Sequence, residues 1–214
     1  MKATTKRSIL IFISAAFICL GCLTSIPTAA SFPMTFQDMF AIIVACILGG
    51  LNGAGATGIF IMIGTIGAPV FLGFHGGISY LLGQYGGFIA GYFLGSIASG
   101  LVLGTPHTFE KKLGWKLYAK VALTAVAGYA LVYLTGAAWY SHILSDTDSS
   151  MTFIKSISIC ITPYLYIIIG KLALTVLASS LLRPAAAKIM YPPEDDEAIF
   201  EELKRKSNLK ANKK

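Results

Sequence analysis

Long apolar runs alternate with short clusters of glycine, proline, asparagine and charge along most of this 214-residue chain. An α-helix needs roughly 20 apolar residues to cross a bilayer, and Gly and Pro commonly mark the points where helices end. Reading the apolar runs against this punctuation predicts six helices, approximately over residues 8–26, 38–51, 54–66, 86–104, 114–138 and 163–183. The second and third are short and are separated only by Asn52 and glycines, which predicts a tight helical pair.

Apolar residues also dominate the whole stretch 152–183. A single helix of this length would measure about 48 Å, which is too long for one crossing of a bilayer. Pro163 divides the stretch naturally, because proline favours the first turn of a helix. The pattern therefore predicts a short outer segment over 150–161, followed by the sixth helix.

Composition indicates an all-α integral membrane protein with six transmembrane helices. Hydrophobic residues make up 55% of the chain, and the mean hydropathy of +0.71 lies outside the range of soluble globular proteins. The net charge of +7 comes mostly from the termini and one short connection, which is typical of membrane flanks rather than of a nucleic-acid-binding surface. We expect a membrane domain over 1–183 and a charged cytoplasmic tail over 184–214.

The distribution of Lys and Arg predicts the topology, because cytoplasmic loops carry an excess of both residues. Basic residues precede the first helix, follow the fourth helix and fill the tail, whereas the predicted outer loops 27–37, 67–85 and 139–150 contain none. This pattern predicts a multi-pass protein of the cell membrane with both termini in the cytoplasm. The basic residues concerned are Lys2, Lys6, Arg7, Lys111, Lys112, Lys116, Lys120, Lys204, Arg205, Lys206, Lys210, Lys213 and Lys214.

The N-terminal segment has a second interpretation, a lipoprotein signal peptide ending at Gly21-Cys22. Such signals normally carry Leu three residues before the cysteine, where this chain has Cys19. Cleavage would also remove one span and leave an odd number of helices. Retention of the segment as the first helix is therefore favoured.

The sequence contains no pattern typical of catalysis or metal binding. Cys19-x-x-Cys22 has metal-binding spacing, but no second Cys/His pair accompanies it, and the three histidines form no His-x-x-x-His pair. Gly170-Lys171 lacks the neighbours of a phosphate-binding loop. We expect no catalytic residue, no metal and no cofactor, and a membrane enzyme or scaffold is the less favoured alternative.

Small residues recur every four positions on two of the predicted helices, which places each set on one helix face. Such faces allow close backbone contact where lipid offers no hydrophobic drive for association. Packing within the chain is favoured over the docking of a partner. The two sets are Gly87, Gly91, Gly95 and Ser99, and Ala41, Ala45, Gly49 and Gly53.

Lys171 is the strongest single candidate for a binding residue. It lies eight residues into the sixth predicted helix, and a charged Lys near a bilayer centre costs about 2.5–3.5 kcal/mol. It is therefore expected to face the protein interior or a cavity. No acidic residue lies within two helical turns, and Asp38, at the end of another span, is the only acid in the other spans. We expect an unpaired cation that receives an anionic group of a substrate, with snorkelling to the interface as the alternative.

The predicted outer loops supply further candidates, especially the loop between the third and fourth helices. Residues 64–104 hold 12 of the 22 glycines, and irregular backbone at membrane depth is tolerated only where protein buries it or it lines a cavity. Apolar walls with a few amides, hydroxyls and aromatic rings suit a small, partly apolar metabolite. The candidate substrate-binding residues in these loops are Thr35, Gln37, His75, Gln84 and Tyr85.

Three segments resemble the BioY family, the biotin-specific S components of energy-coupling factor (ECF) transporters. They are PMTFQ over 33–37, GTIGAPVFLGFHGG over 64–77 and LLGQYGGFIAGYFLG over 81–95. The resemblance covers about residues 10–105 and 163–183. It implies high-affinity capture of biotin at the outer face and its delivery through a transmembrane coupling protein and a pair of ATPases. It also implies that the first helix, around Ala15 and Cys19, docks on the coupling protein.

The chain departs from the family pattern in the sixth helix, which there opens with P-F-x-x-x-D-x-x-K. Pro163, Tyr164 and Lys171 match this pattern, and Tyr164 joins the candidate substrate-binding residues. Ile168 stands where the family has an Asp that contacts the substrate, and Gln84 replaces a Pro of the loop. An S component for a different small vitamin is therefore the alternative function.

Residues 184–214 lie beyond the family resemblance. Pro192-Pro193 precede EDDEAIFEELKRK, with acidic residues first and basic residues last, an order that the helix dipole favours. This predicts a short cytoplasmic helix, with contact to a partner or to anionic lipid as the alternative.

Overall fold

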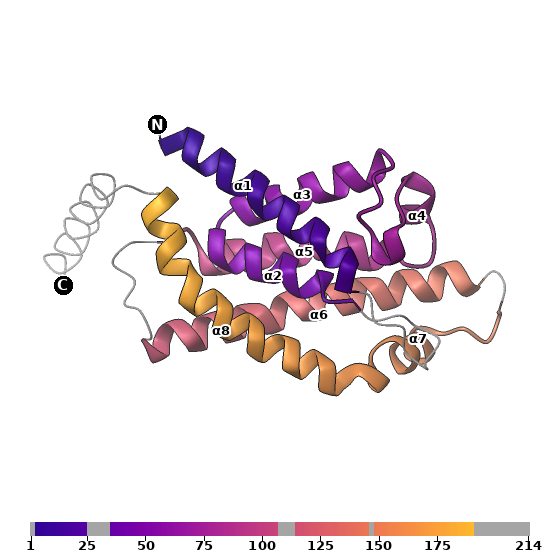
Figure 1. Cartoon of the computed structure of the whole chain (residues 1–214). Coiled ribbons are helices and arrows are strands. Elements are labelled where there is room, and N and C mark those ends of the chain that lie inside the picture. The colour runs from indigo at the N-terminus through magenta and orange to yellow at the C-terminus, as the bar shows by residue number, and fades with distance from the viewer. Residues whose placement is uncertain (1–2, 25–34, 107–113, 146–147, 191–214) are drawn as a thin grey trace, which may run out of the picture.

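The computed structural model describes residues 3–24, 35–106, 114–145 and 148–190. Within these ranges the chain is almost entirely helical (Figure 1), which confirms the predicted all-α class. Its elements are α1 (Ala3–Cys19), η1 (Leu20–Thr24), α2 (Gln37–Leu48), α3 (Asn52–Thr65), η2 (Leu72–Phe74), α4 (Ile78–Leu82), α5 (Gly86–Leu103), α6 (Trp115–Ser145), α7 (Phe153–Cys160), η3 (Thr162–Tyr164) and α8 (Leu165–Met190). Four helical stretches of the described part are long and apolar enough to cross a membrane, namely 4–24, 86–103, 115–145 and 153–190.

Each of the six predicted helical ranges overlaps one helix of the structure. The break at Pro163 is also present, since α7 ends at Cys160 and Pro163 lies in the 3₁₀ turn before α8. Two helices run further than expected: α6 continues past 138 to Ser145, and α8 continues past 183 to Met190. The predicted tail helix, loop residues 27–34 and the connection that holds Lys111 and Lys112 lie outside the described residues.

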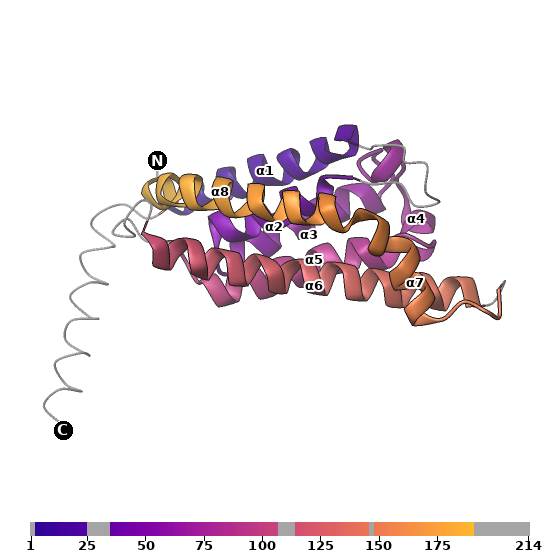
Figure 2. The ribbon, with the colours of Figure 1, turned by 90° about the horizontal axis from the view of Figure 1, so that it is seen from below.

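Helix α2 forms the centre of the molecule. It contacts α1, α3, α5, α6 and α8, and it lies between α8 and α5 in both views (Figures 1 and 2). Ten of its 12 residues are buried. A helix that is apolar all round is suited to such a position, because every face meets protein. The near absence of polar residues from 39 to 48 follows from this burial.

The small residues of α5 allow its backbone to lie directly against α6. A Cβ added at Gly91 would lie 2.5 Å from Thr135 Oγ1 and 2.8 Å from Val132 Cα, and one at Gly95 would lie 2.8 Å from the Gly128 carbonyl oxygen. These distances are too short for any side chain larger than hydrogen. The predicted packing role of this small-residue face is confirmed.

Arg183 explains why α8 extends beyond the predicted end at 183. Its buried guanidinium donates to the carbonyl oxygens of Cys46 at 2.6 Å and Gly104 at 2.9 Å. These carbonyls lie at the C-terminal ends of α2 and α5, where helices lack internal partners and carry partial negative charge. At the last residue of α8, the Met190 carbonyl accepts a hydrogen bond from Arg7 Nε at 2.8 Å. Residues 183–190 therefore belong to the packed bundle, and the boundary predicted at 183 falls inside a helix.

The α5–α6 contact predicts different outcomes for two glycine substitutions. Gly91→Ala should lower the unfolding temperature of the detergent-solubilised protein by several degrees, because overpacking costs about 1–3 kcal/mol. Gly170→Ala is the matched control: it lies in α8 with no atom within 4 Å of an added Cβ. Alanine is favoured over glycine in a helix by up to about 1 kcal/mol, so this variant should unfold at the same or a higher temperature. Equal destabilisation by both would contradict the close-contact interpretation.

Candidate functional site

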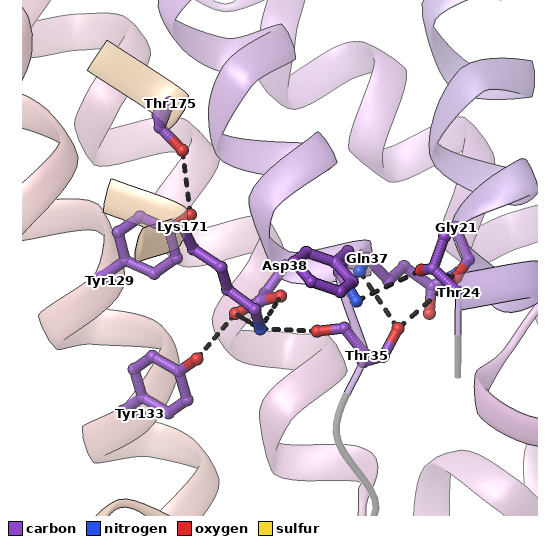
Figure 3. Close-up of polar contacts among 10 residues, drawn as sticks. Gly21, Thr24, Thr35, Gln37, Asp38, Tyr129, Tyr133, Lys171 and Thr175 are labelled. Atoms are coloured by element: carbon purple, nitrogen blue, oxygen red, sulfur yellow. Dashed lines mark hydrogen bonds and ion pairs between the residues drawn. The ribbon is translucent and has the colours of Figure 1, made fainter. Parts of the chain in front are cut away.

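A buried ion pair joins α2 to α8. Lys171 Nζ lies 2.8 Å from Asp38 Oδ1 and 3.0 Å from Asp38 Oδ2, and it also donates to the Thr35 carbonyl oxygen at 2.5 Å (Figure 3). Lys171 is 1% exposed and Asp38 is 3% exposed. The interior position predicted for Lys171 is confirmed, but the prediction that it is unpaired is wrong. Asp38 is 133 residues away in the chain, so a search for acids along the same helix could not find it.

Aromatic side chains complete the surroundings of this pair. The Tyr133 hydroxyl on α6 donates to Asp38 Oδ2 at 2.8 Å, and the ring of Phe36 lies 5.4 Å from Lys171 Nζ, within the range of a cation–π contact. Asp38 also lies in the first turn of α2, where the helix dipole favours negative charge. Both buried charges are therefore compensated, as the low dielectric of an interior requires.

Thr35 and Gln37 hold the start of α2 against neighbouring backbone. Gln37 Nε2 donates to the carbonyl oxygens of Val70 at 2.7 Å and Ile18 at 3.3 Å. Thr35 Oγ1 accepts from the Gln37 backbone N–H at 3.1 Å and donates to the Gly21 carbonyl at 3.4 Å. These bonds fix the direction in which Asp38 enters the protein interior.

A cavity lies beside the ion pair, and we call it the central pocket. Its volume of about 30 Å³ exceeds the roughly 10–15 Å³ that one water molecule needs but leaves room for little more. A larger molecule can enter only if lining side chains move. One end of the pocket is polar and its walls are mainly aromatic. The lining residues are Thr35, Gln37, Asp38 and Lys171, then Tyr80, Tyr85, Phe88, Tyr92 and Tyr133, and then Leu72, Ile89 and Val132.

The connection between α3 and α5 folds over the central pocket as a compact aromatic layer. Phe71 is fully buried, stacks on Tyr80 at 5.6 Å and meets Phe60 edge-on at 5.5 Å. Gly77 adopts φ +93°, a conformation that other residues rarely reach, at the start of α4. Three residues of this connection line the pocket, namely Leu72, Tyr80 and Tyr85.

The predicted site residues fall into two groups. Thr35, Gln37, Tyr85 and Lys171 line the central pocket. His75, Gln84 and Tyr164 do not: His75 stacks on the ring of Tyr80 at 5.2 Å, and Tyr164 is buried at the junction before α8. The remaining lining residues, which the sequence did not predict as part of the site, are Asp38, Leu72, Tyr80, Phe88, Ile89, Tyr92, Val132 and Tyr133.

One feature of the sequence points to Asp38. It carries the single formal charge between Arg7 and Glu110. A charge retained in so long an apolar stretch needs a partner of opposite sign, and Lys171 is the cation that the sequence predicts to face the interior. The aromatic residues of α5 and α6 gave no such signal, because aromatic residues are common in any membrane helix.

The two residues predicted to dock a partner both lie on α1. Ala15 is 1% exposed and faces the interior of the chain, while Cys19 is half-buried. The outward face of α1 consists instead of large apolar side chains. They are Ile9, Phe12, Ile13 and Phe17, followed by Leu20 and Leu23 of η1.

Ile168 is not among the lining residues of the central pocket. It lines a separate apolar groove of about 330 Å³ between α6 and α8, together with Tyr129 and Leu172. Tyr133 borders both this groove and the central pocket.

Comparison with known proteins decides the family. The model of the BioY family matches residues 1–188. The chain belongs to the BioY family. The biotin transporter BioY of Thermotoga maritima is 30% identical over 171 residues, which cover 80% of this chain and 92% of that protein. A probable biotin transporter BioY of Pyrococcus horikoshii is 27% identical over 183 residues, covering 86% and 98%.

The BioY fold is also found among solved structures. The crystal structure of the S-component for biotin from an ECF-type ABC transporter matches with a TM-score of 0.68 at 22% identity. The match covers 84% of this chain and 90% of that one. The family resemblance predicted from the three sequence segments is confirmed.

The ion pair predicts strong coupling between Asp38 and Lys171 in stability. Removing one partner of a buried pair costs about 3–5 kcal/mol, because an uncompensated charge remains. We expect Asp38→Asn and Lys171→Met each to lower the free energy of unfolding by about this amount. The double variant should lose clearly less than the sum of the two.

These free energies can be measured by titrating the purified protein with a denaturing detergent. The exposed pair Lys155–Asp148, at 3.2 Å, supplies the control. Lys155→Met should leave unfolding unchanged, because exposed ion pairs contribute little. Additive losses at Asp38 and Lys171 would contradict the pairing.

Proposed function

We propose that this BioY protein captures biotin and delivers it across the membrane as the S component of an ECF-type transporter. The observation that carries the proposal is the buried Asp38–Lys171 pair at the polar end of an aromatic-walled pocket. Support comes from family membership and from relatives that are themselves named biotin transporters. The function is substrate capture and transport, not catalysis.

The chemistry of biotin corresponds to the two parts of the central pocket. Biotin has a fused bicyclic ring with a cyclic urea and a thioether, and a flexible chain that ends in a carboxylate. Aromatic walls offer large contact area to the ring system and favourable contacts to its sulfur. Asp38, Lys171 and Tyr133 offer hydrogen-bonding groups in a site largely removed from water. Movement of Leu72, Tyr80 or Tyr85 would enlarge the pocket for a molecule of this size.

We further propose that α1, α2, α3, α5, α6 and α8 all span the membrane and that both termini are cytoplasmic. The bond from Arg7 to the Met190 carbonyl brings the start of α1 next to the end of α8. The start of α6 lies at the same end of the bundle (Figure 1). Basic residues therefore gather at one end, as the positive-inside rule requires of a cytoplasmic face.

Delivery of the substrate would require a transmembrane coupling protein and a pair of ATPases. We propose that α1 docks on the coupling protein through its outward apolar face and Cys19. Ala15 would contribute by keeping α1 close to its neighbours, because its small side chain is buried within the chain. This part of the proposal rests on family membership.

The decisive experiment is equilibrium binding of biotin to the purified protein in detergent. We expect a dissociation constant below about 1 μM, equivalent to a binding free energy beyond about −8 kcal/mol. Weaker binding of biotin together with tight binding of another vitamin would assign that vitamin as the substrate instead. That second candidate is favoured by one observation, the position of Ile168 in an apolar groove rather than at the polar end of the pocket.

Lys171 and Gln84 are both candidate binding residues in the sequence, but only Lys171 lines the central pocket. Lys171→Gln, combined with Asp38→Asn so that no buried charge is left unpaired, should weaken biotin binding by about 10- to 100-fold, the worth of one hydrogen bond to a charged group. Gln84→Ala should change the affinity less than about threefold, because Gln84 lies outside the pocket lining. Size-exclusion chromatography should show both variants folded. Unchanged affinity in the double variant would remove Lys171 from the site.

A further inference from the structure

The polar end of the central pocket is close to electrically neutral. Asp38 and Lys171 are the only charged side chains among its described lining residues. They are in direct contact, with one positive and one negative charge. The expectation that this end attracts an anion assumed an unpaired lysine, and that assumption does not hold.

A carboxylate placed against Lys171 would also lie close to the carboxylate of Asp38. Two carboxylates this close together repel each other strongly where water is excluded. A neutral N–H group avoids this repulsion and can donate to Asp38, because a carboxylate accepts hydrogen bonds.

The hydrogen bonds already present leave Asp38 able to accept another. A carboxylate offers about four acceptor positions, and three are used by Lys171 and Tyr133. Oδ1 receives only one of these three bonds. Lys171 Nζ already has three oxygen partners, the Thr35 carbonyl and both carboxylate oxygens of Asp38.

We infer that Asp38 is the specificity-determining residue of this pocket: it neutralises Lys171, so that the inner end binds a neutral N–H-bearing group such as a cyclic urea and not a carboxylate. The inference rests on the proposed function and deepens it. Biotin then enters with its urea ring toward Asp38 and its carboxylate toward Tyr80 and Tyr85. The acid that makes this possible comes from α2, because α8 carries Ile168 three residues before Lys171.

The first test uses the wild-type protein and needs no substitution. Biotinamide, in which the carboxylate is replaced by a neutral amide, should bind within about threefold of biotin. A loss of about 100-fold or more, the scale of a charged hydrogen bond, would place the carboxylate on Lys171 and overturn the inference.

A second measurement stays informative even if the protein does not bind biotin. Thermal unfolding of the wild-type protein is followed with 2-imidazolidinone, a bare cyclic urea, and with pentanoate, the acid chain alone, at equal millimolar concentrations. The urea should raise the unfolding temperature more than the acid does. Stabilisation by pentanoate alone would overturn the inference. Absence of biotin binding alongside stabilisation by the urea would overturn only the proposed substrate.

Substitutions then test Asp38 itself. Asp38→Asn should weaken biotin binding by about tenfold or more, while Asp148→Asn, at an exposed acid in the 148–152 connection, should leave it unchanged. Residues three apart on a helix are neighbours, so Ile168→Asp added to Asp38→Asn should restore part of the affinity by giving Lys171 a new acid. Retained biotin affinity in a folded Asp38→Asn protein would overturn the inference. If this variant fails to fold, the two wild-type measurements decide.

Discussion

The contact between Asp38 and Lys171 is the constraint on which the rest of the structure depends. Each charge alone would be costly inside an apolar bundle, so each position is tolerated only because the other is present. The contact fixes where α2 begins relative to α8, and Tyr133 brings α6 to the same point. It also makes one end of the central pocket polar, while the surrounding walls are aromatic and aliphatic.

The sequence predicted what depends on local chemistry. Apolar runs located the helices, because each run and the Gly, Pro or charge that ends it can be read from neighbouring residues alone. The four-residue spacing on α5 predicted its contact with α6, since side chains four apart share a face whatever the tertiary fold. Lys171 was placed in the interior for the same local reason. Asp38 was not recognised as its partner, because contact between residues 133 apart depends on how the helices cross.

The irregular segments were the least predictable part of the site. Glycines with positive φ, such as Gly77, set the path of the connection before α5, and a small change of path redirects every side chain that follows. Tyr85 lines the pocket, whereas His75 packs on Tyr80 and Gln84 lies outside the lining. Residue types alone could not distinguish the three. Membership of the BioY family could still be detected from the same segment. A motif is recognised from the order of its residues, which does not require knowing where each side chain points.

The two buried cations of α8 have a mechanical consequence. Lys171 is bonded at the first turn of α2, and Arg183 is bonded to the Cys46 carbonyl near its last turn. Helix α8 therefore cannot slide along α2 or swing away from it without breaking a hydrogen bond of a charged side chain. Helices α2 and α8 are therefore expected to behave as one rigid body. Any opening that admits a ligand is then expected in the connection between α3 and α5, where Leu72, Tyr80 and Tyr85 line the pocket and Tyr80 Oη donates to the Leu72 carbonyl.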